Sequence, residues 1–260
     1  MKHLLECWDK LADDFNVNEV FILLDCDGTL TPIVDYPGNA ILDNAVKDVL
    51  RELSRKYMVA IISGRSLVDV KSLVDVGGIY YAGNHGFEIS GPGINLHKPG
   101  LVSIKPLMEE ISLNLMEFFK DIDGVLVENK GVTVSLHYRM VSPEKRRRVK
   151  RLFLERIAEY VDGGKLRFSS GKMVYEIRPD IDWDKGAAVR WLVDSLGKQD
   201  NLLVYVGDDR TDEDAFGALG EGDVAVLVCA DGVRDSLADY FLRDVSEVRN
   251  FLHLLSSVKD

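Results

Sequence analysis

Cysteine is scarce in this chain of 260 residues. The three cysteines, Cys7, Cys26 and Cys229, are odd in number and far apart, which argues against a disulfide framework and against a zinc site. No run of about 18 apolar residues occurs, so no membrane-spanning helix and no membrane partner are expected. The first residues carry an acidic side chain early and too short an apolar run for a signal peptide. We therefore expect a cytoplasmic protein.

Positive charge is also in short supply. Lysine and arginine number 32 against 43 acidic residues, and the net charge of −11 disfavours a nucleic-acid partner. One basic run, Lys145–Arg151, falls on a predicted helix without interleaved aromatic residues, and we interpret it as a solvated helix face. The hydrophobic content of 46% is typical of a globular protein. The length allows one large domain or a domain with a sizeable insert.

The most informative stretch lies between Phe21 and Leu30. Its four apolar residues before Asp25 predict a buried strand of a parallel sheet. Asp25 and Asp27 follow two positions apart, so on extended backbone they point to the same side. Close buried carboxylates repel one another, and a cation relieves that repulsion. One aspartate could attack a phosphorus atom while the other moves a proton; the alternative is a strand that ends in a capped turn.

Three further motifs follow apolar strands or open a helix. They are Ser63-Gly64-Arg65, Trp183-Asp184-Lys185-Gly186 and Gly207-Asp208-Asp209-Arg210-Thr211-Asp212-Glu213. Together with the stretch from Phe21 to Leu30, and in this order, they resemble the motifs of the haloacid-dehalogenase-type phosphatases. The resemblance implies a phosphate monoester as substrate, because Asp27 supplies an acid for an oxygen leaving group.

Four residues are the candidate catalytic groups. Asp25 is the expected nucleophile, which forms an aspartyl-phosphate, and Asp27 the expected acid and base. Ser63 can donate a hydrogen bond to a phosphoryl oxygen, and Lys185 adds a positive charge beside it and Asp25. The structural alternatives are a strand-end turn for Ser63 and a solvated helix start for Lys185.

A single Mg²⁺ ion is the expected cofactor. Its protein ligands would be Asp25, Asp208 and the backbone carbonyl of Asp27, with water and phosphate completing an octahedron. Asp209 and Asp212 resemble further acids of the family, which bind the metal through water or orient the lysine. Asp212 is equally well interpreted as the N-cap of the following helix.

The order of predicted elements indicates an α/β fold. Strands and helices alternate up to about residue 100 and again from about residue 181, which predicts a doubly wound parallel sheet. Between them the pattern is α+β. We therefore expect a catalytic core from residues 1–103 and 181–260, with an inserted α+β cap domain at 104–180.

The strands of the insert separate apolar from polar side chains. On residues 132–139, valine, leucine and tyrosine alternate with threonine, serine, histidine and arginine, and the last strand alternates in the same way. The sheet therefore has one apolar face and one polar face of mixed charge. The polar face is either exposed to solvent or a lid over a sugar, whose hydroxyl groups both donate and accept hydrogen bonds.

Several segments resemble the trehalose-6-phosphate phosphatases, and the resemblance covers nearly the whole chain after the first 17 residues. These segments are 81–86, 127–130, 137–139, 171–179 and 207–213. The family often has serine where this chain has Asn84. The resemblance implies cap residues that grip the glucose ring remote from the chemistry. With Arg65, which contacts either the phosphate or a neighbouring acid, the candidate substrate-binding residues are Arg65, Asn84, His85, Glu128, Lys130, His137, Arg139, Lys172 and Glu176.

The expected function is therefore Mg²⁺-dependent hydrolysis of trehalose 6-phosphate to trehalose and phosphate by a monomer. One alternative is a phosphatase for another sugar phosphate, such as sucrose 6-phosphate. The other is a catalytically silent sugar-phosphate sensor, which the complete set of acids, serine and lysine disfavours.

Overall fold

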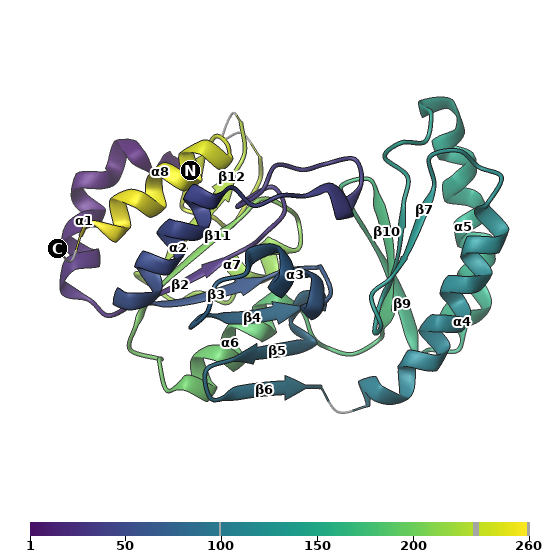
Figure 1. Ribbon diagram of the computed structural model, residues 1–260, viewed down its shortest axis with the longest axis horizontal. Coiled ribbons are helices and arrows are strands. Elements are labelled where there is room, and N and C mark those ends of the chain that lie inside the picture. The colour runs from purple at the N-terminus through teal and green to yellow at the C-terminus, as the bar shows by residue number, and fades with distance from the viewer. Residues whose placement is uncertain (99, 231–233, 259–260) are drawn as a thin grey trace. The chain divides into compact units, whose positions relative to one another are not determined.

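The computed structural model describes residues 1–98, 100–230 and 234–258. The chain divides into two compact units, one formed by residues 1–96 and 183–260 and the other by residues 97–182 (Figure 1). Each unit has its own buried apolar cluster. Among the described residues no helix has the length and apolar character needed to cross a membrane.

The first unit is built on a largely parallel sheet. Nine strands of the described chain lie in the order β1-β13-β12-β11-β2-β3-β4-β5-β6. In this order, each pair of neighbouring strands from β1 at one edge through to β4 is parallel, and β5 pairs antiparallel with β4. The strands are β1 (Lys2–His3), β2 (Val20–Leu24), β3 (Met58–Ile62), β4 (Tyr80–Gly83), β5 (Glu88–Gly91), β6 (Ile94–His97), β11 (Leu202–Gly207), β12 (Val224–Val228) and β13 (Tyr240–Leu242).

Helices cover both faces of this sheet, which confirms the doubly wound α/β fold. One face packs against α1, α2, α3 and α8 in a single apolar cluster that includes Ile22 and Leu24 of β2. The opposite face carries Tyr205 of β11, whose ring meets Phe216 of α7 edge to face. The helices are α1 (Trp8–Val17), α2 (Asn44–Lys56), α3 (Leu67–Val74), α6 (Lys185–Leu196), α7 (Asp212–Phe216) and α8 (Val245–Ser256).

Capping side chains explain where several helices begin. At the start of α2, Asp43 accepts a hydrogen bond from the backbone N–H of Ala45. Ser66 caps α3, and Asp184 caps α6 by accepting from the N–H of Ala187. The cap at Asp184 matters most for the site, because it makes Lys185 the first residue of α6.

Several short strands were not predicted individually. After β12, the described residues form the strand β13 and then α8. The short strands β1, β5 and β6 were also missed. Strands of two to four residues are too short for an alternation of polar and apolar side chains to stand out from the surrounding sequence, and their neighbours in the sheet stabilise them.

The second unit is an α+β layer. Its antiparallel sheet has the order β7-β8-β10-β9. Val134, Leu136, Tyr175 and Ile177 are buried against α4 and α5, which confirms the predicted apolar face. The elements are α4 (Leu101–Phe119), β7 (Leu126–Asn129), β8 (Val134–His137), α5 (Pro143–Asp162), β9 (Leu166–Gly171) and β10 (Val174–Pro179).

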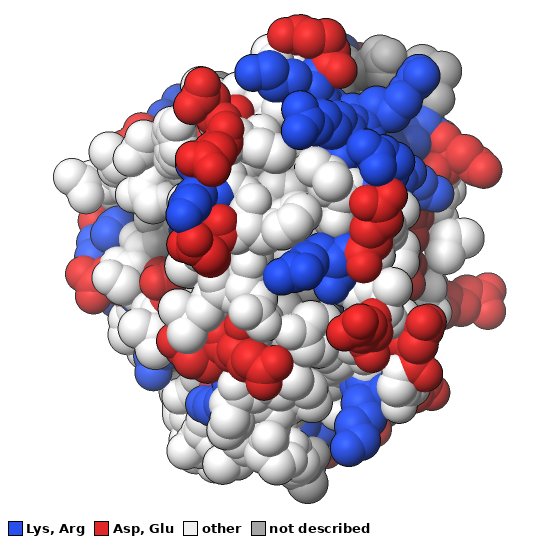
Figure 2. Space-filling model, turned by 90° about the vertical axis from the view of Figure 1, so that its right-hand side faces the viewer, with Lys and Arg blue, Asp and Glu red and all other residues white. Residues whose placement is uncertain are grey.

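The basic run lies in the first half of α5. Lys145, Arg147, Arg148 and Lys150 are exposed, and Arg151 pairs with Glu155 one turn later at 2.9 Å. Figure 2 shows lysine and arginine side chains gathered on one part of this side of the molecule. The helix buries its other side through Val149, Phe153 and Ile157, so the run lies on the solvated side of an amphipathic helix.

We expect Phe153→Ala to destabilise the second unit by about 3–5 kcal/mol, because it removes a fully buried ring. Phe153 stacks on Tyr175 with ring centroids 5.0 Å apart and meets Phe168 edge to face. Urea unfolding followed by circular dichroism measures the loss. Leu113→Ala, at a position 56% exposed, is the control and should cost about 0.5 kcal/mol or less. Equal effects of the two substitutions would contradict this packing.

Candidate active site

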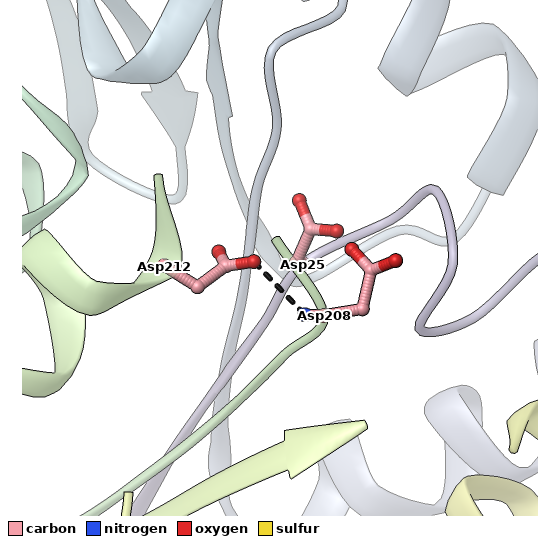
Figure 3. A group of neighbouring side chains, drawn as sticks. All are labelled: Asp25, Asp208 and Asp212. Atoms are coloured by element: carbon pink, nitrogen blue, oxygen red, sulfur yellow. Dashed lines mark hydrogen bonds between the residues drawn. The ribbon is translucent and has the colours of Figure 1, made fainter. Parts of the chain in front are cut away.

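Three aspartates meet at the carboxyl ends of two adjacent strands. β2 and β11 pair in parallel, with Leu24 opposite Val206, so Asp25 and Asp208 emerge side by side. The N–H of Asp25 donates to the carbonyl of Val206 at 2.9 Å, which fixes this register at the end of the strands. Carboxylate oxygens of Asp25, Asp208 and Asp212 all lie within 4.8 Å of one another (Figure 3).

Lys185 joins two of these aspartates. Its Nζ donates to Asp25 Oδ1 at 2.6 Å and to Asp212 Oδ1 at 2.7 Å, and the side chain is 3% exposed. The structure therefore places Lys185 beside Asp25, and the alternative of a solvated helix start is wrong. A cation at the N-terminus of α6 opposes the helix dipole, and the two carboxylates compensate for that position.

Asp212 acts as a hydrogen-bond acceptor for its surroundings. Oδ1 accepts from Lys185 and from the hydroxyl of Tyr205, the latter at 2.8 Å. Oδ2 accepts from the backbone N–H groups of Asp208 and Asp209 at 2.9 and 2.8 Å. The interpretation of Asp212 as an N-cap is wrong, because it is the first residue of α7 and the cap position belongs to Thr211. Its geometry is that of a residue that orients the lysine.

Burial and charge shift the pKa values of this cluster in different directions. Burial raises the pKa of Asp25 well above its usual value; Lys185 opposes the rise, and the charges of Asp212 and Asp208 add to it. Burial would also raise the pKa of Asp212, but attraction to Lys185 and the hydrogen bonds it accepts hold this pKa below the usual value. Burial would lower the pKa of Lys185, yet Asp212 and Asp25 raise it.

The donor set fits a divalent cation. Asp25, Asp208 and Asp212 are all buried, and Lys185 is the cation that the structure places against two of them. Three carboxylates and one ammonium leave an excess of two negative charges, which a divalent ion would balance. Hard oxygen donors are the ligands that Mg²⁺ prefers. Because both oxygens of Asp212 already accept two hydrogen bonds each, Asp25 and Asp208 are the carboxylates better placed to bind it.

Gly28 makes room for Asp208. Its backbone has a φ of +89°, and a Cβ atom there would lie 1.9 Å from Asp208 Oδ2. Glycine is therefore required for two reasons, the left-handed backbone and the close approach of the carboxylate.

Asp27 pairs with Arg65 instead of joining the three buried aspartates. The Nε and Nη2 atoms of Arg65 donate to the two Asp27 oxygens, both at 2.7 Å, and Nη2 also donates to the carbonyl of Pro37. Of the two contacts expected for Arg65, the structure shows the one to a neighbouring acid. The contact to phosphate stays a prediction.

The loops after β3 and β4 are bonded to each other. The hydroxyl oxygen of the buried Ser63 accepts from the N–H of Arg65 at 3.1 Å, so Ser63 does form a strand-end turn. The N–H groups of Asn84 and His85 donate to the carbonyls of Arg65 and Ser63. Asn84 Nδ2 donates to Glu88, and the ring of His85 lies against Gly64. Arg65, Asn84 and His85 are thus neighbours of Ser63.

The predicted sugar-binding residues of the second unit are brought together on its polar face. Glu176 Oε1 accepts from Lys130 at 3.1 Å and from the hydroxyls of Thr133 and Ser135. The other contacts are the His137–Glu128 hydrogen bond at 2.8 Å and the bond from Arg139 to the carbonyl of Lys172 at 2.9 Å. Their contact with a sugar stays a prediction.

Three residues that support this site were not predicted from the sequence. Tyr205 looks like an ordinary strand residue, and Arg234 lies in a segment without any motif. Glu213 belongs to the last motif, but its role depends on Arg234, to which it bonds at 2.8 Å. The tyrosine in an otherwise aliphatic strand was the one signal available, because a buried hydroxyl needs a partner.

The fold and the cluster of acids place this chain in the class of haloacid-dehalogenase-type phosphatases. A solved structure of the Candida albicans trehalose-6-phosphate phosphatase C-terminal domain superposes with a TM-score of 0.80 and 25% identity, over 95% of this chain and 96% of that one. The trehalose-phosphatase family model matches residues 23–246. The chain therefore belongs to the trehalose-phosphatase family.

Two relatives extend this comparison to plants and bacteria. Trehalose-phosphate phosphatase B of Arabidopsis thaliana is 36% identical over 96% of this chain and 70% of that protein. The trehalose-phosphate phosphatase of Mycobacterium marinum is 37% identical over 98% of this chain and 67% of that protein.

Gly28→Ala should reduce phosphatase turnover by about 100-fold or more, because the added methyl displaces Asp208 and a shift of about 1 Å at such a site has that effect. Steady-state phosphate release measures the loss. Gly38→Ala is the matched control, because a methyl group added there would have no atom of the described chain within 4 Å beyond its immediate chain neighbours. Full activity of Gly28→Ala would contradict the close approach of Asp208.

Proposed function

We propose that this protein is a Mg²⁺-dependent phosphatase that hydrolyses trehalose 6-phosphate through an aspartyl-phosphate. Membership of the trehalose-phosphatase family supports the substrate. The observation that carries the mechanism is the buried contact of 2.6 Å between Lys185 Nζ and Asp25 Oδ1, with Asp208 beside them. A lysine held against a carboxylate at a strand end can neutralise charge on an attacking oxygen and on a phosphoryl group.

The first half of the reaction transfers the phosphoryl group to the protein. An oxygen of Asp25 attacks phosphorus while the bond from phosphorus to the sugar oxygen breaks. Asp27 gives its proton to the leaving oxygen, so trehalose departs as a neutral alcohol. Lys185 and the hydroxyl of Ser63 bind the phosphoryl oxygens.

The second half releases phosphate. A water molecule attacks phosphorus, and Asp27 accepts the proton that the water loses. The bond between phosphorus and Asp25 breaks, which restores the carboxylate. The reaction is therefore balanced: one water is consumed, and one sugar and one phosphate are formed.

Mg²⁺ would be held by Asp25, Asp208 and the backbone carbonyl of Asp27, and when bound it supplies positive charge for the phosphoryl oxygens. The excess of negative charge in the buried cluster supports this assignment.

In this scheme Arg65 controls when Asp27 can act as an acid. Its two hydrogen bonds hold both oxygens of Asp27, so Asp27 has to leave Arg65 before it can give up a proton. We expect the phosphate to draw Arg65 away, since a guanidinium binds phosphate and carboxylate with the same two-pronged geometry. Arrival of substrate then frees the acid.

The polar face of the second unit is proposed to bind the glucose ring remote from the phosphate. Its charged and hydroxyl side chains already hold one another in place, which supports a preorganised surface for sugar hydroxyls.

Asp25→Asn should lower kcat by about 1,000-fold or more, since the nucleophile is lost. Phosphate release from trehalose 6-phosphate with Mg²⁺ is the assay, and EDTA should abolish it in the wild type. Asp48→Asn, on the exposed side of α2, is the control and should stay fully active. Retained activity in Asp25→Asn would reject the mechanism, and activity in EDTA would reject the cofactor.

Lys130→Gln should raise KM for trehalose 6-phosphate about tenfold, because a hydrogen bond to a charged group contributes about 1.5 kcal/mol or more. Glutamine can still donate to Glu176, so the fold should persist. Lys145→Gln on α5 is the control.

A second measurement compares kcat/KM for trehalose 6-phosphate, sucrose 6-phosphate and glucose 6-phosphate. Equal values across this panel in the wild type would contradict the assigned substrate.

A further inference from the structure

The backbone of two consecutive residues after β11, Asp208 and Asp209, is held by two side chains. The N–H groups of Asp208 and Asp209 both donate to Asp212 Oδ2. Their carbonyl groups both accept from Arg234, from Nη1 to Asp208 and from Nη2 to Asp209, each at 3.1 Å. The backbone that carries Asp208 is therefore fixed through its donors and its acceptors at once.

Arg234 is itself anchored by Glu213. Its Nη2 donates to Glu213 Oε1 at 2.8 Å, and Glu213 Oε2 accepts from the hydroxyl of Ser236 and the N–H of Leu237. The arginine and the glutamate are 29% and 23% exposed, so the pair is largely shielded from solvent. Glu213 thus ties the segment around Arg234 to the first turn of α7.

This arrangement requires the shape of arginine. A guanidinium has five N–H donors in a rigid plane and can bond two carbonyls and a carboxylate together. An ammonium group is a compact point charge and cannot span the same three acceptors. The pair of carbonyls therefore selects arginine for its geometry as well as its charge.

The position of Asp208 leaves little tolerance. A Cβ atom on Gly28 would lie 1.9 Å from Asp208 Oδ2, so even a small rotation of the Asp208 peptide moves the carboxylate against or away from the Gly28 backbone. A carboxylate that binds a cation with near-ideal octahedral demands has to be held in one direction. The Arg234 contacts act on the peptide that sets this direction.

We propose that Arg234, anchored by Glu213, is a positioning residue for Asp208 and that its loss weakens the binding of a divalent cation. This inference rests on the proposed function. Contacts that orient metal ligands typically change metal affinity by about 10–100-fold when they are removed. The hydrogen bonds of Arg234 within the described chain go to the loop after β11 and to Glu213, so it acts through the loop and not on the reacting atoms.

The test compares Arg234→Met, Arg234→Lys and Glu213→Gln with the wild type. Titration calorimetry with MgCl₂ gives the dissociation constant without any turnover, and Mn²⁺ paramagnetic resonance gives an independent one. We expect the dissociation constant for Mg²⁺ to rise about tenfold or more in Arg234→Met and by less in Arg234→Lys. At saturating Mg²⁺, KM for the sugar phosphate should stay within about twofold of the wild type.

Arg243→Met is the matched control. Arg243 also pairs with a glutamate, Glu247, at 2.7 Å, and its ion pairs among the described residues do not involve the loop after β11. Its Mg²⁺ affinity should be unchanged. If Arg234→Met does not fold, Arg234→Lys and Glu213→Gln carry the test, with melting temperatures as the check on folding.

The outcomes separate the inference from the proposed function. A wild type that binds Mg²⁺ and needs it for activity, with variants that bind it equally tightly, overturns the positioning role and leaves the proposed function standing. A wild type that binds no Mg²⁺ overturns the proposed cofactor and this inference with it. Weaker binding in the Arg234 variants but not in Arg243→Met supports the inference.

Discussion

The buried ammonium group of Lys185 between Asp25 and Asp212 is the interaction on which the site depends. A buried charge without partners has a large desolvation penalty, and here two carboxylates compensate for it. Three features of the fold place the charged groups of this cluster. Adjacent parallel strands bring Asp25 and Asp208 to the same edge of the sheet, and the cap at Asp184 makes Lys185 the first residue of α6. The hydroxyl of Tyr205 and two backbone N–H groups hold Asp212 in place. The same cluster carries more negative than positive charge, and the proposed binding of a divalent cation rests on this excess.

The two units carry different kinds of polar network. In the buried cluster of the first unit the acids outnumber the bases. In the second, Glu176 accepts from Lys130 and two hydroxyls while Glu128 bonds His137, so charges of both signs largely satisfy one another. Such a surface offers hydrogen-bond donors and acceptors with little net charge, which is the basis for the proposed contact with the hydroxyls of a neutral sugar.

Much of the fold and part of the site could be predicted from the sequence, because apolar strands and the acids that follow them form a recognisable pattern. Apolar strands that end in acids identified Asp25 and Asp208 as candidates for the site. Three roles were possible for Asp212 from the sequence alone, namely metal binding, orientation of the lysine and helix capping. The sequence could not separate them, because each of these roles uses a carboxylate at that position. Arg234 gave no signal, since its partners are backbone carbonyls that any sequence provides. Strands such as β1 and β13 are too short to show a period and form through their neighbours.

The order of segments along the chain has a consequence for biosynthesis. Residues 97–182 are continuous, so the second unit can complete its internal contacts as soon as they leave the ribosome. The first unit is interrupted: β2 pairs with β11, which is translated only after the whole insert. Pairing over such a long sequence separation is slow and cannot begin until residues 202–207 have been synthesised. During translation Asp25 is therefore made long before Lys185, Asp208 and Asp212, and the buried cluster of charges can form only after the whole insert has been synthesised.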